Sequence, residues 1–457
     1  MLFGLAIGLA IPARSADPTA TGLDATAAGC LFDNYHPGDP RDEKNKGQDR
    51  SEGEWRQVAK LRFAAHPQPK VPLRSYADES EPKAMGTKIA TNCSPGSNKP
   101  LVGAIRWDAW QENGEIQATV EATLGPNHWH YRLPFFARVT GSNSVAINGN
   151  TQAIMDQEIN YAANAGIDYW AFVIYPAASG MSHGLQLYLK SRFKNRIHFT
   201  LNLQGGWVAG KTEGWDAQMT RYVNYFKDPA YQKVLGNRPL VFLFNRIART
   251  PEFPDAVAGA TAIQQLRAAT TNAGLGNPYI VFQGWNATDD FNTMREYGLD
   301  AIGAYAVFSD PAIGTSYPAL AAKARRMWEA GQATGANVVP IVTAGWDDRT
   351  RVENRTPWTT GSTNYTVPPT PAELANHLAD ALQWTSSHLT TATPARTVLI
   401  YAWNENDEGG WLVPTLNPDG STNADRLAAI AAKLKHETES NRLPRARIST
   451  TQSNEKP

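Results

Sequence analysis

The chain has 457 residues, 42% of them hydrophobic, with 43 lysines and arginines balanced by 43 aspartates and glutamates. The length suits one large barrel or two to three smaller domains, and the zero net charge provides no general attraction to nucleic acid or anionic lipid. The 14 tryptophans are many for this length, and such a surplus of indole rings suits a cleft that stacks on the apolar faces of sugar rings.

The chain begins with an apolar stretch, residues 2–11, followed by Pro12 and a short segment ending at Ala16. This stretch has the length of a signal-peptide core and is too short to span a bilayer. No basic residue precedes it, so the alternative is that it is not a signal. We predict that residues 1–16 are a signal peptide and that the chain is secreted or periplasmic, with no membrane attachment after signal removal.

Residues 17–100 are rich in Pro, Gly, Asp, Lys and Ser and have no sustained periodicity apart from a short helical stretch near 54–62. This composition predicts an irregular N-terminal extension packed on the main domain. The two cysteines of the chain, Cys30 and Cys93, both lie in the extension. In an oxidising compartment they could form a disulfide, and the alternative is two free thiols.

From residue 101 onward, short β-type runs alternate with amphipathic helical stretches. The predicted strands are 101–107, 168–175, 197–203, 239–245, 279–283, 301–305, 338–343 and 397–403. The predicted helices are 152–165, 216–234, 258–271, 318–334, 371–387 and 424–434.

This alternation predicts an α/β fold, a (β/α)8 TIM barrel over residues 101–435 followed by a polar tail at 436–457. A doubly wound open sheet is the alternative, but it would need a glycine-rich phosphate loop or a switch-point site, and neither is evident. The first connection, 108–151, is long for a loop between a strand and a helix. Its alternating runs at 116–120 and 131–139 predict an inserted hairpin over the barrel mouth.

In such a barrel, the C-terminal ends of the strands converge on one cleft. Nearly every predicted strand end offers an aromatic ring or an amide, as a polyhydroxylated ligand requires. Packing of the barrel is the alternative role for each residue taken singly. The predicted substrate-binding residues are Trp107, Asp108, Tyr175, Asn202, Trp207, Asn245, Trp285, Tyr305, Trp346, Asp347, Arg351, Trp403 and Asn404, with Gln204, Gln283 and Asp348 at the same ends.

We predict no metal and no cofactor. His128 and His130 alternate as on a strand and could share a face, but a third ligand and a zinc-binding helix motif are missing. His183 is a lone histidine after the second strand, with a structural role as the alternative to lining the cleft. The sequence has no serine nucleophile elbow, Cys-His pair or Walker loop.

The last predicted strand leads into the segment that carries the predicted chemistry. Residues 401–414 read YAWNENDEGGWLVP, which places Glu405 and Glu408 three residues apart among tryptophans and an asparagine. Two carboxylates at a strand end are the minimal equipment for cutting a glycosidic bond. The alternative is a charged surface loop, and Asp407 is a rival for either carboxylate role.

These residues resemble a known family. Residues 101–435 are similar to the WbsX-type proteins, a branch related to glycoside hydrolase family 99, the endo-α-mannosidases and endo-α-mannanases. Residues 155–175 resemble the segment from helix one to strand two, residues 345–351 (GWDDRTR) resemble the strand-seven GWDN stretch, and residues 402–414 resemble the WNEWxEG…LEP signature. The resemblance implies a (β/α)8 barrel and a polysaccharide-active glycoside hydrolase.

The resemblance also implies roles for the two glutamates. Glu405 would deprotonate the 2-hydroxyl of the sugar, which attacks the anomeric carbon, so that configuration is retained. Glu408 would protonate the leaving oxygen and then activate water. These roles require a raised pKa for Glu408 and an ionised Glu405.

The sequence departs from the family pattern at several positions. Asn406 replaces the signature Trp, Val413 replaces the Glu of LEP, and Asp348 replaces the Asn of GWDN. The altered positions are expected to surround the substrate, so the sugar and its linkage do not follow from the resemblance.

Two other functions are compatible with the sequence. One is a non-catalytic carbohydrate-binding barrel, although both glutamates are present. The other is a polysaccharide-biosynthesis glycosyltransferase, which would need a nucleotide-sugar site that the generic Asp289-Asp290 pair does not supply. The expected partner is a polysaccharide or oligosaccharide substrate, and the sequence gives no oligomeric state.

Overall fold

The computed structural model describes residues 99–205, 213–248, 252–359 and 361–440. The predicted signal peptide, the helical stretch at 54–62, the two cysteines, Trp207 and the last part of the polar tail lie outside the described residues.

Eight parallel strands form the centre of the fold. They are β1 (Leu101–Arg106), β4 (Tyr169–Val173), β5 (His198–Gln204), β7 (Arg238–Phe244), β8 (Tyr279–Gln283), β9 (Ala301–Gly303), β10 (Ile341–Thr343) and β11 (Thr397–Tyr401). Their order is β10-β11-β1-β4-β5-β7-β8-β9, and a parallel bridge between Ile302 and Val338 joins the two ends. The predicted (β/α)8 barrel is confirmed.

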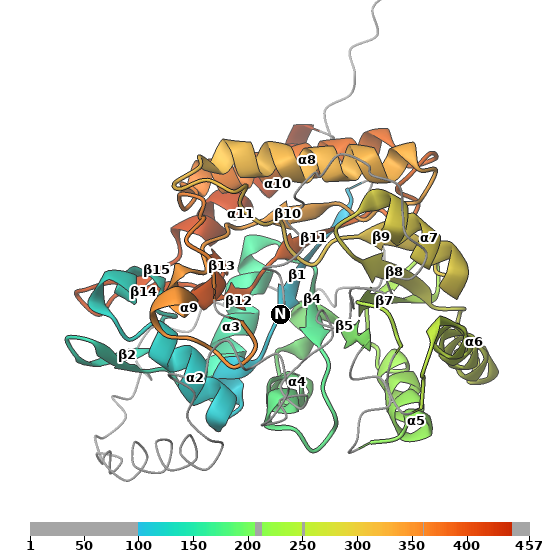
Figure 1. Cartoon of the computed structure of the whole chain (residues 1–457), viewed down its shortest axis with the longest axis horizontal. Coiled ribbons are helices and arrows are strands. Elements are labelled where there is room, and N and C mark those ends of the chain that lie inside the picture. Colours follow the sequence, from blue (N-terminus) through green and yellow to red (C-terminus); the bar gives the residue numbers. More distant parts are fainter. Residues whose placement is uncertain (1–98, 206–212, 249–251, 360, 441–457) are drawn as a thin grey trace, which may run out of the picture.

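Helices surround these strands, with α8 and α10 along one side and α5 and α6 on another (Figure 1). No helix among the described residues is long and apolar enough to cross a bilayer. The surrounding helices are α3 (Gln152–Ala165), α4 (His183–Lys190), α5 (Trp215–Phe226), α6 (Ala256–Asn272), α7 (Ala287–Tyr297), α8 (Tyr317–Ala333), α10 (Pro371–Ser387) and α11 (Asp425–Ser440).

Local capping fixes the two helices whose bounds agree with the sequence prediction. Thr151 accepts a hydrogen bond from the backbone N–H of Ile154 at the start of α3, and Gly166 ends this helix with a φ of 85°. At the start of α10, Thr370 and Glu373 form a reciprocal capping box, with Pro371 in the first turn. These signals satisfy the free backbone groups at the helix ends and are readable from the sequence.

The barrel floor is closed by an aromatic ring that lies across a glycine. A Cβ atom on Gly103 would lie 2.1 Å from Cζ of Tyr169, so no larger residue fits on β1 at this point. The Tyr169 hydroxyl lies 2.8 Å from the Thr397 hydroxyl on β11. The ring stacks on Phe242 of β7, with centroids 6.5 Å apart. The interior is therefore packed below the mouth.

The insertion after β1 differs from the predicted hairpin. Residues 116–120 belong to a helix, α2 (Glu115–Thr123), because Gln117, Val120 and Thr123 form a buried face with helical spacing. Residues 131–139 begin in the 3-10 helix η5 (Asn127–Arg132) and end in β2. The hairpin lies later, in β2 (Arg138–Gly141) and β3 (Ser144–Ala146).

The predicted helix over 216–234 is also too long. Helix α5 ends at Phe226, just before Pro229, which cannot continue a helix. Lys233–Val234 forms a short strand, β6, antiparallel to β7.

Candidate active site

A short two-stranded loop carries both predicted catalytic glutamates. After β11, Asn404–Glu405 (β12) pairs with Gly410–Trp411 (β13), and the 3-10 turn η9 (Asn406–Glu408) joins the two strands. Glu405 is 3% exposed and Glu408 is 2% exposed. The pair is therefore inside the protein and not on a charged surface loop.

Two barrel tyrosines hold the two carboxylates. The Tyr305 hydroxyl, beyond the end of β9, donates a 2.7 Å hydrogen bond to Oε1 of Glu405. The Tyr401 hydroxyl, at the end of β11, donates to Oε2 of Glu408. The two tyrosine rings lie 5.7 Å apart between centroids, so both glutamates face the same part of the barrel mouth.

Glu408 has a second, charged partner. Nη1 of Arg351 forms an ion pair with Oε1 of Glu408, and Nε of the same guanidinium donates to Oδ2 of Asp407 at 2.8 Å. Arg351 is buried in the short helix α9 (Arg349–Glu353). The hydroxyl of Thr350 on the same helix donates to the Asp407 carbonyl at 2.5 Å. Asp407 is therefore a partner of Arg351.

The surroundings of Glu405 are different, because no charged side chain among the described residues is bonded to it. Burial raises the pKa of Glu405 well above its ordinary value, and the negative charges of Glu408 and Asp407 add to this effect. The Tyr305 hydrogen bond and the charge of Arg351 act in the opposite direction. A raised pKa for Glu405 is opposite to the expectation from the family resemblance.

The loop after β10 packs directly on the glutamate loop. The Asp347 backbone N–H donates to the Glu408 carbonyl at 2.7 Å. A Cβ atom on Gly409, whose φ is 82°, would lie 2.6 Å from the Asp347 nitrogen. Glycine is therefore required where these two loops meet.

The two aspartates of this loop have different environments. Hydrogen bonds from Arg349 and the charges of Arg349 and Arg132 lower the pKa of Asp347 against the effect of burial. Burial, with a contribution from the charge of Glu408, raises the pKa of Asp348 to about 7. Asp348 also accepts a 3.1 Å hydrogen bond from the Ser362 backbone N–H. Asp347 therefore supports the loop, and Asp348 is, after Asp407, a further carboxyl group close to the pair.

A second group of predicted residues links the ends of β1, β4 and β5. The indole N–H of Trp107 donates to the Tyr175 hydroxyl at 2.6 Å, and Gln204 donates to the same oxygen at 3.1 Å. The Asn404 amide bonds both backbone groups of Trp107, at 2.9 and 2.6 Å. Asn404 therefore fixes the glutamate loop to β1, and its amide is already satisfied.

Two predicted substrate-binding residues lie elsewhere. Nε of Arg106 donates to Asp108 at 2.7 Å, and the Glu158 carboxylate on α3 binds Arg106 at 2.9 and 3.1 Å and Trp403 at 2.9 Å. Trp403 has no exposed surface, and its ring lies 5.0 Å from that of Trp170. Trp403 thus packs the barrel against α3, and Asp108 is held by Arg106 beside Gly184 of α4. That these two residues contact a ligand stays a prediction.

The remaining predicted residues lie around the mouth. Trp346 lies 5.8 Å from the Tyr401 ring, Trp285 donates to the Ala306 carbonyl at 3.1 Å, and Asn245 is half-buried with a φ of 65°. Buried polar atoms without a partner occur on β5 and β8, both amide atoms of Asn202 and one oxygen each of Gln204 and Gln283. These amides can accept or donate hydrogen bonds to water or a ligand.

The histidines of the insertion have protein partners. His128 lies 3.0 Å from Glu353, and His130 lies 2.8 Å from the Gly125 carbonyl. Both belong to the 3-10 helix η5 and not to a strand. Within the described residues, no group of three His, Cys, Asp or Glu side chains could hold a metal ion.

Tyr401 and Arg132 were not predicted from the sequence. Tyr401 ends β11, and its inward direction follows from the alternation along the strand. Arg132 lies in the misassigned insertion, where its guanidinium pairs with Asp347 and lies 4.4 Å from the Trp129 ring centroid. No sequence pattern linked it to the site.

No family model matches the chain, and no curated protein matches it. Among solved structures, the family 99 endo-alpha-mannosidase of Bacteroides thetaiotaomicron is 13% identical, with a TM-score of 0.46 over 76% of this chain and 98% of that one. A family 39 glycoside hydrolase of Bacteroides cellulosilyticus WH2 is 11% identical, with a TM-score of 0.36 over 74% of this chain and 64% of that one.

Proposed function

We propose that the chain is a secreted glycoside hydrolase that cleaves a polysaccharide or glycan with Glu405 and Glu408. The observation that carries the proposal is the loop on which both carboxylates are buried at the barrel mouth, each with a different set of partners. Paired carboxylates in unlike surroundings are what acid and base roles require. Trp107, Tyr175 and Trp346 near the mouth would cover the sugar rings.

The resemblance gives one assignment of roles. Glu405 takes the proton of the 2-hydroxyl, the 2-oxygen attacks the anomeric carbon, and Glu408 protonates the departing glycosidic oxygen. Glu408 then removes a proton from water, the water oxygen opens the 1,2-anhydro ring, and Glu405 returns its proton to the 2-oxygen. Configuration is retained after two inversions.

The contacts favour the exchanged assignment as the second candidate. Arg351 and Tyr401 both donate to Glu408, and a carboxylate held by a guanidinium and a hydroxyl suits a base. Glu405, whose pKa is raised by burial, suits a proton donor. In this candidate Glu408 takes the proton of the 2-hydroxyl, and Glu405 protonates the leaving oxygen.

Glu405→Gln and Glu408→Gln should each reduce polysaccharide hydrolysis by at least about 100-fold without unfolding the protein. The matched control is Glu353→Gln, because Glu353 is a half-exposed carboxylate on the neighbouring helix α9. Normal turnover by either glutamate variant would reject the role of that residue.

Aryl glycosides with an activated leaving group separate the two assignments, since such a group departs without protonation. The variant that lacks the acid should keep turnover of the aryl glycoside, whereas the variant that lacks the base should lose it. Anomeric NMR of the products across a polysaccharide panel would give the sugar, the linkage and the stereochemistry.

Two further outcomes would support other functions. Saccharide binding without hydrolysis on any polymer of the panel would support a carbohydrate-binding barrel, and transfer from a nucleotide sugar would support a glycosyltransferase. Secretion is proposed from residues 1–16 alone. A reporter protein that is fused after residue 16 and stays in the cytoplasm would reject it.

A further inference from the structure

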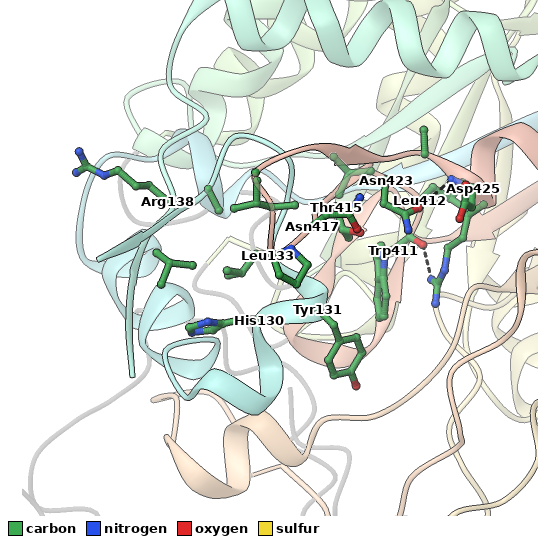
Figure 2. Close-up of a pocket in the computed structure, with 18 of the residues that line it drawn as sticks. His130, Tyr131, Leu133, Arg138, Trp411, Leu412, Thr415, Asn417, Asn423 and Asp425 are labelled. Carbon is green, nitrogen blue, oxygen red and sulfur yellow. Dashed lines mark hydrogen bonds between the residues drawn. The ribbon is translucent and has the colours of Figure 1, made fainter. Parts of the chain in front are cut away.

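A groove of about 1030 Å³ lies beside the candidate active site, on the flank of the barrel. Its walls come from the insertion after β1 and from the chain between β13 and α11, with Pro371 at one edge. Figure 2 shows Tyr131 and Trp411 close together in the groove, with Leu133 and Leu412 nearby. His130 and Val413, which the sequence analysis considered, line this groove, whereas none of the predicted catalytic or substrate-binding residues does.

The groove offers aromatic surface. The Tyr131 side chain is 47% exposed, and its ring lies 6.3 Å from that of Trp411 at an angle of 61°. Val139, also from the insertion after β1, lines the groove and is 48% exposed. A ligand with flat apolar faces, such as a pyranose ring, suits such a surface.

The groove also contains Arg426, which has no counter-ion in the part of the chain that the structure describes. The guanidinium carbon of Arg426 lies 3.7 Å from the centroid of the Trp411 ring. Nη1 donates to the carbonyls of Trp411 and Ala344 at 2.8 and 3.2 Å, so the guanidinium is held in place. No carboxylate among the described residues lies within ion-pair distance of it.

Burial and a neighbouring positive charge both disfavour the charged form of Arg426, and a bound anion would offset these effects. Burial lowers the pKa of Arg426 to about 9, and the positive charge of Arg132 adds to this effect. Arg138 also lines the groove, and Asp425 is the one carboxylate among the lining residues. A guanidinium fixed on an indole face presents its free N–H groups to a carboxylate, which matches the fork geometry.

We propose that this groove binds an acidic saccharide chain, with the carboxylate of a uronic acid residue on Arg426 and a sugar ring against Tyr131. Trp411 connects the groove to the active site, because it pairs with Asn404 in the two-stranded loop that carries Glu405. The groove would thus hold a neighbouring stretch of the polymer beside the catalytic pair. The choice of a saccharide rests on the proposed function, but binding is measured without hydrolysis.

The test compares acidic oligosaccharides with their neutral methyl esters, using calorimetric titration of the full chain. The probes are tetramers of galacturonic, glucuronic and mannuronic acid. At least one free acid should bind ten times more tightly than its ester, and the difference should shrink in high salt. Equal binding of acid and ester, or binding of none of the three acids, would overturn the proposal.

Variants locate the binding. Arg426→Gln should remove the preference for the acid and leave the affinity for the ester unchanged, whereas Arg426→Lys should keep part of the preference. Tyr131→Ala should weaken both probes. Arg295→Gln is the matched control, because Arg295 also lies over an aromatic ring, 5.8 Å from that of Phe291 on α7.

Two outcomes would place the groove in another role. A preference for the acid that survives in Arg426→Gln would assign the binding to another surface. A dimer that dissociates on Tyr131→Ala would show that a second copy of the chain covers the groove. Normal hydrolysis by the glutamate variants together with intact acid binding would reject the catalytic roles and leave the groove proposal standing, so the two proposals fail separately.

Discussion

Replacement of Arg351 by methionine is the most informative single change in the candidate site. Arg351 forms ion pairs with Asp407 and Glu408, and all three side chains are buried. Methionine would leave two carboxylates unpaired in the interior beside Glu405. Breaking a buried ion pair by removing one partner costs about 3–5 kcal/mol of the free energy of unfolding, and Arg351 serves two partners.

The destabilisation should depend on pH. Burial raises the pKa of Asp407 above its ordinary value, and the charge of Arg351 opposes this rise. Without Arg351, the pKa of Asp407 in the folded protein rises further above its value in the unfolded chain. The cost is then fully present above the folded pKa and disappears as the pH falls below the unfolded value, because the carboxyl group is neutral in both states.

Urea denaturation followed by tryptophan fluorescence at pH 8 and pH 5 would measure both effects. The loss in Arg351→Met should be larger at pH 8, and adding Asp407→Asn should recover part of it. Arg325→Met is the control, since Arg325 pairs with two carboxylates at the surface, Glu329 and Asp380, and its loss should cost no more than about 1 kcal/mol. Equal losses at both pH values, with no recovery in the double variant, would refute the ion-pair argument.

Three other changes test the site and the fold. Tyr305→Phe removes the hydrogen bond to Glu405, so the pKa of Glu405 should rise and the pH profile of hydrolysis should move to higher pH; an unchanged profile would contradict this. Asp348 has a pKa raised to about 7, so its contribution to stability should fall by up to about 4 kcal/mol from pH 4 to pH 7, and Asp348→Asn should remove this slope in unfolding titrations. Gly103→Ala forces a Cβ atom onto the Tyr169 ring and should cost about 1–3 kcal/mol, with Tyr169→Ala as the second change that relieves the clash in a double-variant unfolding measurement.

The fold was predictable because several local signals agreed with one another. Helices α3 and α10 have the predicted bounds, since Thr151, Gly166 and the Thr370–Glu373 capping box mark their ends in the sequence. The insertion was not predictable, because an alternating run such as 116–120 fits a strand and a helix face about equally well. The buried residues of this segment are three apart, which is helical spacing. Only the packing of α2 on the barrel decides between the helix and the strand.

The candidate site was predictable only in part. The position of the glutamate loop follows from its place after the last strand. The direction of each side chain does not, because the alternation ends where the strand ends. Asp108 bonds Arg106 and lies against Gly184 of α4, whereas Trp403, beyond the last residue of β11, bonds Glu158 on α3. Arg351 and Tyr401 become partners of Glu408 only through long-range contacts.

The barrel seam between β9 and β10 has a consequence for how the molecule opens. Seven neighbouring strand pairs share a ladder, whereas this junction has the single bridge at Ile302, with hydrogen bonds of 2.8 Å to Asn337 and 2.9 Å from Val339. Amide protons at this junction should exchange with solvent before those of β1 or β4. New chain termini placed in the connection between β9 and β10 should therefore destabilise the barrel less than termini placed between any other two neighbouring strands.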